Sequence, residues 1–306
     1  MKILLTGKDG QLGFELQRAL APLGTLVAVG RAQCDLARPD AIRRLVAEVR
    51  PRIIVNAAAY TAVDKAEADP EAACAINATA PGLLGEEAAK CDALVVHYST
   101  DYVFDGLKPA PYTEEDVPNP LSVYGRSKQA GERALIASGA RHLIFRTSWV
   151  FGAHGGNFVK TILRLAAERS ALEVVSDQHG APTPAALIAD VTAQILGQYL
   201  RGCRFASADF PYGLYHLAAA GETTWHAYAQ QIVRWAQDAG MPLKLRPQDI
   251  QPITTADYPT AARRPANSRL ETRKLRETFG LCLPDWRQGL EHVMMQILPE
   301  GPYHAS

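Results

Sequence analysis

Residues 1–13, MKILLTGKDGQLG, decide the fold of this chain. The apolar run over residues 1–6 predicts a strand, and the apolar spacing after it predicts a helix that ends at Gly24. A glycine-rich turn between a strand and a helix lets a pyrophosphate approach the backbone at the helix N-terminus. The stretch therefore predicts a nucleotide-binding turn. Its glycines have the spacing GxxGxxG and are Gly7, Gly10 and Gly13.

The same alternation of strand and helix continues outward from this stretch. Together with the helix that contains Tyr124, it predicts a Rossmann-type doubly wound parallel sheet, an α/β fold. Further strands are expected at 26–29, 52–56, 93–98, 142–147 and 214–217, and helices at 40–50 and 70–90.

After residue 151 the pattern loosens, which predicts a smaller C-terminal α/β domain, and the family resemblance given below implies that this domain binds the substrate. Residues 1–150 with about 184–220 are expected to form the cofactor domain, and about 151–183 with 221–306 the substrate domain. Helices are expected at 157–168, 184–200 and 226–239, with a loop, DQHGAPT, at 177–183.

Composition excludes several classes of function. The chain has 306 residues with 32 basic and 32 acidic side chains, so nucleic acid and acidic membranes are not expected partners. Its five cysteines contain no CxxC pattern, which argues against a disulfide framework or a zinc site. No apolar run is long enough to span a bilayer and no signal peptide is evident, so we expect a cytoplasmic protein.

The end of the second predicted strand bears on the choice of cofactor. Enzymes that bind NAD often carry an acid at this point for the ribose 2′-hydroxyl, whereas an arginine accommodates a 2′-phosphate. This chain has Gly30 followed by Arg31, which favours NADPH over NADH, although Arg31 is equally well explained as a surface residue. Asp35, in the loop that follows, can face the adenine.

Tyr124 and Lys128 lie four residues apart near the start of a predicted helix, on one face of it. Such a pair is often no more than a solvated helix surface. An ammonium beside a phenol can lower the pKa of the phenol, which would make Tyr124 an acid and base. The cluster Ser99-Thr100-Asp101-Tyr102 follows a buried strand, where ligands bind in open α/β sheets.

Four arginines lie close together near the C-terminal end of the chain. In a chain of zero net charge this local excess suggests a phosphate partner, although a solvated surface explains it as well. They are Arg263, Arg264, Arg269 and Arg273.

Taken together, the motifs resemble the extended short-chain dehydrogenase/reductase family over nearly the whole chain. They are GKDGQLG, NAAAYTAVDKAE, HYSTDYVFDG, YGRSK, FRTSWVFG, DQHGAPT and RRPANSRL. The resemblance implies NADPH-dependent reduction of the C4 keto group of a dTDP-linked sugar, with NADH also accepted. No partner besides the dTDP-sugar is expected, and we expect a monomer or weak homodimer.

The resemblance also implies roles for single residues. Tyr124 would give its proton to the C4 oxygen, Lys128 would bind the nicotinamide ribose and acidify Tyr124, and Thr100 would hydrogen-bond the same oxygen. Asp101 and Trp149 would contact the sugar nucleotide. The remaining residues would bind the cofactor: Gly7, Gly10, Gln11 and Leu12 at the pyrophosphate, Arg31, Asp35 and Leu36 at the adenosine, and Ala59, Tyr60, Thr61 and Tyr98 further along.

One departure from the family concerns metal. Some members join two protomers through a Mg²⁺ held by glutamates, one of them in the helix after the GAPT loop. Glu15 is present here, but alanines stand at the expected helix start, Ala185-Ala186, so no metal is expected.

Two other functions stay open at this point. A nucleotide-sugar dehydratase or epimerase could share the fold, although a dehydratase typically needs an Asp-Glu pair and here Tyr102 follows Asp101. A related fold also serves as an NADP-binding regulatory subunit of methionine adenosyltransferase, and the intact Tyr124 and Lys128 pair leans towards catalysis instead.

Overall fold

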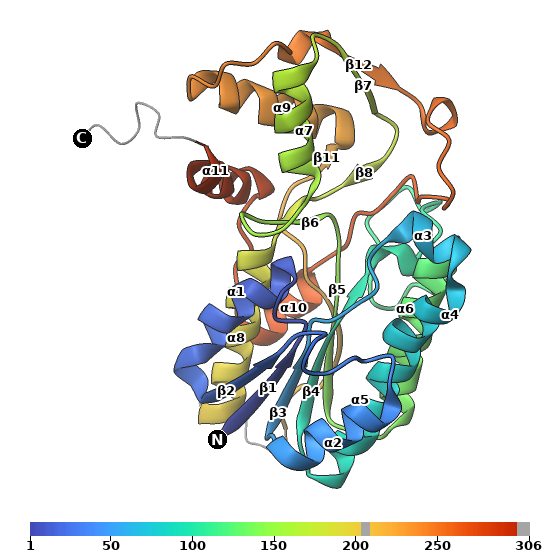
Figure 1. The fold of residues 1–306 in the computed structure, drawn as a ribbon, viewed down its shortest axis with the longest axis vertical. Coiled ribbons are helices and arrows are strands. Elements are labelled where there is room, and N and C mark those ends of the chain that lie inside the picture. Colours follow the sequence, from blue (N-terminus) through green and yellow to red (C-terminus); the bar gives the residue numbers. More distant parts are fainter. Residues whose placement is uncertain (203–208, 299–306) are drawn as a thin grey trace, which may run out of the picture.

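The computed structural model describes residues 1–202 and 209–298. Its centre is a six-stranded sheet in the order β10-β5-β4-β3-β1-β2, with every neighbouring pair parallel (Figure 1). The doubly wound parallel sheet is therefore confirmed, including the late return of β10 to its edge. The strands are β1 (Lys2–Thr6), β2 (Thr25–Val29), β3 (Ile53–Asn56), β4 (Leu94–Thr100), β5 (His142–Thr147) and β10 (Gly213–His216).

Helices cover both faces of this sheet, which is why its strands read as apolar runs and not as alternating patterns. Ile3 and Leu5 of β1 point into one core, with α1, α8 and α10, whereas Leu4 between them points into the other, with α2, α5 and α6. The helices of the first face are α1 (Gln11–Leu20), α8 (Ala185–Arg201) and α10 (Arg273–Phe279). Those of the second are α2 (Pro39–Val49), α5 (Ala80–Lys90) and α6 (Val123–Ala137).

A smaller body lies beyond the carboxyl ends of the sheet strands and has its own core (Figure 1). Its helices pack through Val159, Ile232 and Leu290 around the buried Trp286. The helices are α7 (Phe158–Glu168), α9 (Trp225–Asp238) and α11 (Trp286–Ile297), beside the parallel pair β7 (Leu172–Val175) and β12 (Ile250–Ile253). Helix α10 departs from the expected boundaries, because its Leu275 and Phe279 pack in the core of the sheet and not in this body.

Several short elements were not anticipated from the sequence. The helix expected over 70–90 is three segments, α4 (Pro70–Cys74), a π turn η2 (Ala75–Thr79) and α5, and a separate helix α3 (Val63–Ala68) precedes it. The loop DQHGAPT holds β8 (His179–Gly180) and β9 (Thr183–Pro184), which pair with β11 (Thr223–Thr224) and β6 (Val150–Phe151). Single 3₁₀ turns are η1 (Ala21–Leu23), η3 (Asp101–Val103), η4 (Pro247–Asp249) and η5 (Thr255–Asp257).

The four cysteines within the described residues are free thiols, of which Cys34 is buried and Cys74, Cys91 and Cys282 are exposed. Cys203 lies outside the described residues. Among the helices of residues 1–202 and 209–298, none is long and apolar enough to cross a membrane.

Candidate active site

The glycine-rich turn has the backbone geometry that the sequence predicts. Gly7 has φ +76°, and a Cβ there would lie 2.6 Å from the Ala58 nitrogen; a Cβ at Gly13 would lie 1.9 Å from the Gly7 oxygen. Helix α1 starts at this turn with no side-chain cap and no acid in its first turn. Its first N–H groups are therefore available to an anion, so the turn fits a pyrophosphate.

The loop after β3 is fixed by a buried asparagine that sequence reasoning missed. The Tyr60 nitrogen donates to Asn77 Oδ1 at 2.8 Å, and Asn77 Nδ2 donates to the Tyr60 oxygen at 3.0 Å. Asn77 Nδ2 also donates to Ser127 Oγ of α6 at 3.0 Å. Asn77 therefore ties the expected cofactor loop, with half-buried Ala59 and exposed Thr61, to the helix that carries Tyr124.

The candidate adenosine residues lie just beyond the carboxyl end of β2. The Arg31 side chain is 82% exposed, and its Nε is 4.0 Å from Asp35 Oδ1, at the limit of an ion pair. Leu36 is buried and packs in the core between the sheet and α2. The guanidinium of Arg31 is therefore held only weakly and remains accessible to a ligand.

Lys128 is almost fully buried below the expected substrate position. Its Nζ donates to the Tyr98 oxygen at 2.6 Å and lies 3.3 Å from His97 Nε2. Burial lowers the pKa of Lys128 to about 8, opposed by Glu132. Below this pH the ammonium predominates, so Lys128 can donate further hydrogen bonds to a ligand hydroxyl.

His97 extends this contact into a buried polar chain that sequence reasoning also missed. Burial and the neighbouring Lys128 hold the pKa of His97 well below its usual value, so the imidazole is neutral. Its Nδ1 lies 3.1 Å from the Asn56 amide, which in turn contacts Thr6 Oγ1 at 2.7 Å. If Nε2 accepts from Lys128, Nδ1 carries the proton and the amide must turn its oxygen towards it.

Tyr124 lies beside Thr100 at the carboxyl end of β4. Burial raises the pKa of Tyr124, a hydrogen bond with Thr100 lowers it in part, and Asp101 and Tyr102 raise it further. The expected acidification by Lys128 is not found, since the ammonium is turned to Tyr98 and His97 instead. Tyr124 is therefore a neutral hydroxyl at physiological pH, which is the form that donates a proton.

Asp101 is a buried carboxyl next to this hydroxyl cluster. Burial raises its pKa to about 6, opposed by hydrogen bonds from Ser268 and Thr100. Thr100 Oγ1 donates to Asp101 Oδ1 at 3.0 Å and accepts from the Tyr102 nitrogen at 3.1 Å. Ser268 belongs to the RRPANSRL segment. This segment therefore contacts the Asp101 carboxyl through a serine hydroxyl and not through one of its arginines.

Trp149 has a strained backbone and an aromatic neighbour from the smaller body. Its φ is +48°, which is unusual for a bulky residue. The indole stacks on Trp225 of α9 with 3.7 Å between ring centroids, and a Cβ at Gly180 would lie 2.5 Å from it.

The side chain of Tyr98, an expected cofactor residue, does not face the site. It lies in the core, where its hydroxyl forms a hydrogen bond with Thr192 Oγ1 at 2.9 Å.

The arginines of the C-terminal loops do not form a free cationic cluster. Arg264 pairs with Asp64 at 2.7 Å and donates to the Tyr102 hydroxyl at 3.3 Å. Arg269 pairs with Glu222 at 2.8 Å. These two arginines therefore tie the C-terminal loops to the rest of the chain. Since their charges are already paired with protein carboxylates, the structure does not favour a phosphate partner for them.

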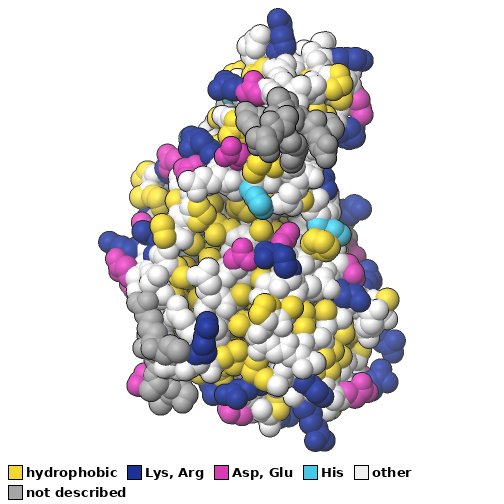
Figure 2. Space-filling model, turned by 90° about the vertical axis from the view of Figure 1, so that its left-hand side faces the viewer, with side chains coloured by type: hydrophobic (Ala, Val, Ile, Leu, Met, Phe, Trp, Pro, Cys, Tyr) yellow, Lys and Arg dark blue, Asp and Glu magenta, His cyan; other side chains and the backbone are white. Residues whose placement is uncertain are grey.

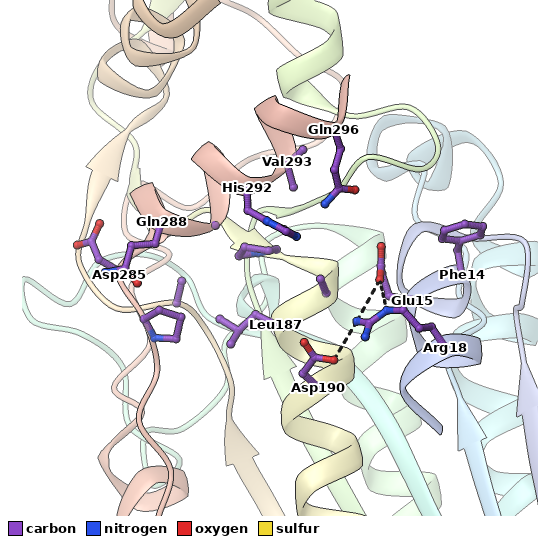
Figure 3. Close-up of a pocket in the computed structure, with 15 residues that line it drawn as sticks. Phe14, Glu15, Arg18, Leu187, Asp190, Asp285, Gln288, His292, Val293 and Gln296 are labelled. Carbon is purple, nitrogen blue, oxygen red and sulfur yellow. Dashed lines mark hydrogen bonds and ion pairs between the residues drawn. The ribbon is translucent and has the colours of Figure 1, made fainter. Parts of the chain in front are cut away.

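A cavity of about 650 Å³ lies between α1, α8 and α11, away from this chemistry. Acidic and basic side chains lie next to one another near the middle of the face in Figure 2, amid hydrophobic ones. Figure 3 shows Arg18 between two carboxylates, 3.4 Å from Glu15 and 2.9 Å from Asp190.

The lining of this cavity bears on the argument from Ala185-Ala186. Helix α8 starts at these alanines, and Asp190, more than one turn later, pairs with Arg18, which also pairs with Glu15. Among the residues that the structure describes, no group of three or more histidine, cysteine, aspartate or glutamate side chains is arranged to hold a metal ion. The expectation of no metal stays a prediction. It now rests on Arg18, whose guanidinium already supplies positive charge to the carboxylates of Glu15 and Asp190.

Comparisons with known proteins show the family of this chain. The model of the RmlD substrate binding domain family matches residues 1–298. The dTDP-4-dehydrorhamnose reductase of Escherichia coli (strain K12) is 50% identical over 97% of this chain and 98% of its own length. That of Burkholderia thailandensis is 48% identical over 98% of this chain and 100% of its own length. The crystal structure of the reductase from Bacillus anthracis in complex with NADP superposes with a TM-score of 0.85, at 33% identity, over 96% of this chain and 99% of that one.

Proposed function

This chain belongs to the RmlD substrate binding domain family, and on that basis we propose its function and the roles of its residues. It reduces the C4 keto group of dTDP-4-dehydro-L-rhamnose to give dTDP-L-rhamnose, with NADPH as the reductant. The observation that carries this conclusion is identity of 48–50% to reductases over nearly the whole chain. The neutral Tyr124 hydroxyl beside Thr100, with Lys128 buried below, supports it.

In the proposed mechanism NADPH supplies the hydride to C4 when it is bound. Tyr124 donates the phenolic proton to the C4 oxygen as negative charge develops on it, so a carbonyl becomes a hydroxyl. Thr100 directs a hydrogen bond at the same oxygen. Lys128, whose Nζ is fixed by the Tyr98 oxygen and His97, orients the nicotinamide ribose through its remaining N–H donor.

We assign the cofactor to the glycine-rich turn and the strand ends beside it. Gly7 and Gly13 let the turn pack closely on Ala58 and on itself. The first N–H groups of α1, at Gly10, Gln11 and Leu12, then bind the pyrophosphate. Ala59, Tyr60 and Thr61 form the cofactor wall that Asn77 holds in place, with Tyr98 contributing its backbone. Arg31 receives the 2′-phosphate of NADPH, and Asp35 and Leu36 lie near the adenine.

The sugar nucleotide is assigned to the space between the two bodies. Asp101, with its pKa near 6, and the Trp149 indole are the proposed contacts. The cofactor domain would comprise residues 1–150 and about 184–220, and the substrate domain about 151–183 and 221–306, with α10 transferred to the first. We propose a cytoplasmic protein that is a monomer or weak homodimer.

Oxidation of NADPH in the presence of dTDP-4-dehydro-L-rhamnose tests this function. We expect absorbance at the nicotinamide band to fall only when the keto sugar is present, with dTDP-L-rhamnose identified by nuclear magnetic resonance. The matched control is dTDP-glucose, which has no keto group to reduce. Oxidation with an unchanged sugar, or a product that has lost water, would contradict the proposal.

A further inference from the structure

We propose that Asp9, in the glycine-rich turn, is a determinant of cofactor specificity that faces the 2′ position of the adenosine ribose. It replaces the acid that dinucleotide-binding folds often carry at the end of the second strand, and it opposes a 2′-phosphate. This assignment rests on the proposed function, since it concerns the cofactor of that reaction.

The structure places the Asp9 carboxylate where a side chain of residue 30 would begin. A Cβ added to Gly30 would lie 1.9 Å from Asp9 Oδ2 and 3.0 Å from its Cγ. Gly30 follows directly after β2 and has no side chain of its own. The carboxylate therefore reaches from the glycine-rich turn to the position from which an acid after β2 contacts the ribose.

Backbone contacts hold Asp9 in this position. The Lys8 nitrogen donates to the Val29 oxygen at 3.2 Å, which fastens the turn to the last residue of β2. His154 Nε2 lies 3.1 Å from the Asp9 oxygen, and its ring stacks on Phe14 with 4.3 Å between centroids. The backbone position from which the carboxylate reaches Gly30 is thus set by the fold of the turn.

The Asp9 carboxylate is available to a ligand. The residue is exposed, and within the described part of the chain its side-chain oxygens have no hydrogen bond or ion pair. The Gly30 nitrogen already donates to Gln33 Oε1 at 2.9 Å, so it is not a donor for the Asp9 carboxylate.

Two opposite charges then act on the same part of the cofactor. A carboxylate accepts a hydrogen bond from the 2′-hydroxyl of NADH, but a 2′-phosphate places like charge beside it. Arg31, one residue after Gly30, attracts that phosphate. Asp9 therefore limits the preference for NADPH that Arg31 provides, and keeps NADH usable.

Binding of NAD⁺ and NADP⁺ to the whole protein, measured by titration calorimetry, tests the assignment. Asp9→Asn removes the charge and keeps a polar group of the same size. We expect the dissociation constant for NADP⁺ to fall about tenfold while that for NAD⁺ changes about twofold or less. Asp40→Asn, at the exposed start of α2, is the control for net charge and is expected to change neither constant.

Simpler ligands separate the ribose from the nicotinamide end. Adenosine 2′,5′-bisphosphate is expected to gain affinity in Asp9→Asn as NADP⁺ does, and ADP is expected to bind as before. An unchanged ratio of NADP⁺ to NAD⁺ affinity, or an equal change in Asp40→Asn, would overturn the role of Asp9. A wild-type protein that binds neither dinucleotide would overturn the proposed function and this assignment with it.

An exchange of the two positions tests the geometry directly. Asp9→Ala frees the space beside Gly30, so Asp9→Ala combined with Gly30→Asp places a carboxylate there from the strand end. We expect the double variant to return the affinity ratio towards that of the wild type, whereas Asp9→Ala alone favours NADP⁺. A double variant that behaves like Asp9→Ala would show that the carboxylate does not act at this point.

Discussion

Two regions of this molecule bring acids and bases together, and they differ in their contact with water. In the active site, Lys128 and Asp101 are buried, and burial moves the pKa of each towards neutrality. In the cavity between α1, α8 and α11, Arg18 bridges Glu15 and Asp190 with side chains that are partly or largely exposed.

The comparison shows that neither the size of a cavity nor the presence of ion pairs identifies the candidate active site of this protein. The cavity of about 650 Å³ contains solvated ion pairs, whose contribution to stability is typically small. The active site contains desolvated groups that destabilise the fold and gain reactivity. Removing a charge should therefore have opposite effects in the two regions, and the following variants test this from the largest expected effect to the smallest.

Tyr124→Phe should have the largest effect, because it removes the proposed proton donor from the buried site. General acid catalysis is typically worth about 10²–10⁴ in rate, so we expect kcat to fall by that order. Steady-state kinetics with NADPH and the keto sugar measure it. The affinity for NADPH should remain close to that of the wild type, which is the control for folding. A variant that retains most of its kcat in a chemistry-limited assay would show that another group is the acid.

Asp101→Asn should stabilise the protein without ligand, in a manner that depends on pH. Burial raises the pKa of Asp101 from its ordinary value of 3.8 to about 6, so the folded protein binds the proton more tightly than the unfolded chain. The ionised carboxyl therefore lowers the stability of the folded protein increasingly as pH rises from about 4 to about 6, and by a constant amount above that. We expect Asp101→Asn to gain about 1–3 kcal/mol at about pH 7.5 and little at about pH 4.

Urea unfolding at the two pH values measures this gain. Catalysis should weaken in the same variant, since Asp101 is a proposed substrate contact. Equal stability of variant and wild type at both pH values would mean that Asp101 is not desolvated in solution.

Arg31→Ala tests an exposed charge that acts only when a ligand arrives. Its side chain is 82% exposed, so the free protein should keep its stability. A hydrogen bond to a charged group contributes about 1.5–3 kcal/mol, and solvent exposure weakens it, so we expect kcat/KM for NADPH to fall about tenfold. The NADH reaction, measured in parallel, should barely change. If the ratio of the two kcat/KM values stays as in the wild type, Arg31 is only a surface residue.

Asp190→Asn should have the smallest effect and the opposite sign to Asp101→Asn. It removes an ion pair with Arg18 in which the Arg18 and Asp190 side chains are 61% and 48% exposed. Exposed pairs contribute about 0.2–1 kcal/mol, so we expect a loss within this range. Urea unfolding at low and high salt checks it, because screening should reduce the loss. A loss as large as the gain in Asp101→Asn would remove the contrast between the two regions.

The sequence predicts the features that depend on local pattern. The alternation of strands and helices, the glycine turn before α1 and the return of β10 all follow from periodicity and glycine positions. The grouping of Tyr124 with Thr100 is different, because it is implied by the family resemblance and does not follow from periodicity.

The features that sequence reasoning missed depend on contacts between distant segments. Asn77 reads as one more helical residue, and only the fold places its amide against Tyr60 and Ser127. His97 reads as part of a buried strand, and its contact with Lys128 joins residues 31 apart. The Arg18 and Asp190 pair joins residues 172 apart, which no local pattern encodes.

The stacked indoles of Trp149 and Trp225 have an optical consequence. Trp149 follows β5 of the larger body, whereas Trp225 opens α9 of the smaller one. Two indoles in face-to-face contact couple their electronic transitions, so the pair should give a circular dichroism couplet that neither ring gives alone. The molecule thus carries an intrinsic spectroscopic marker of how its two bodies are placed, which would report on their movement without any attached dye.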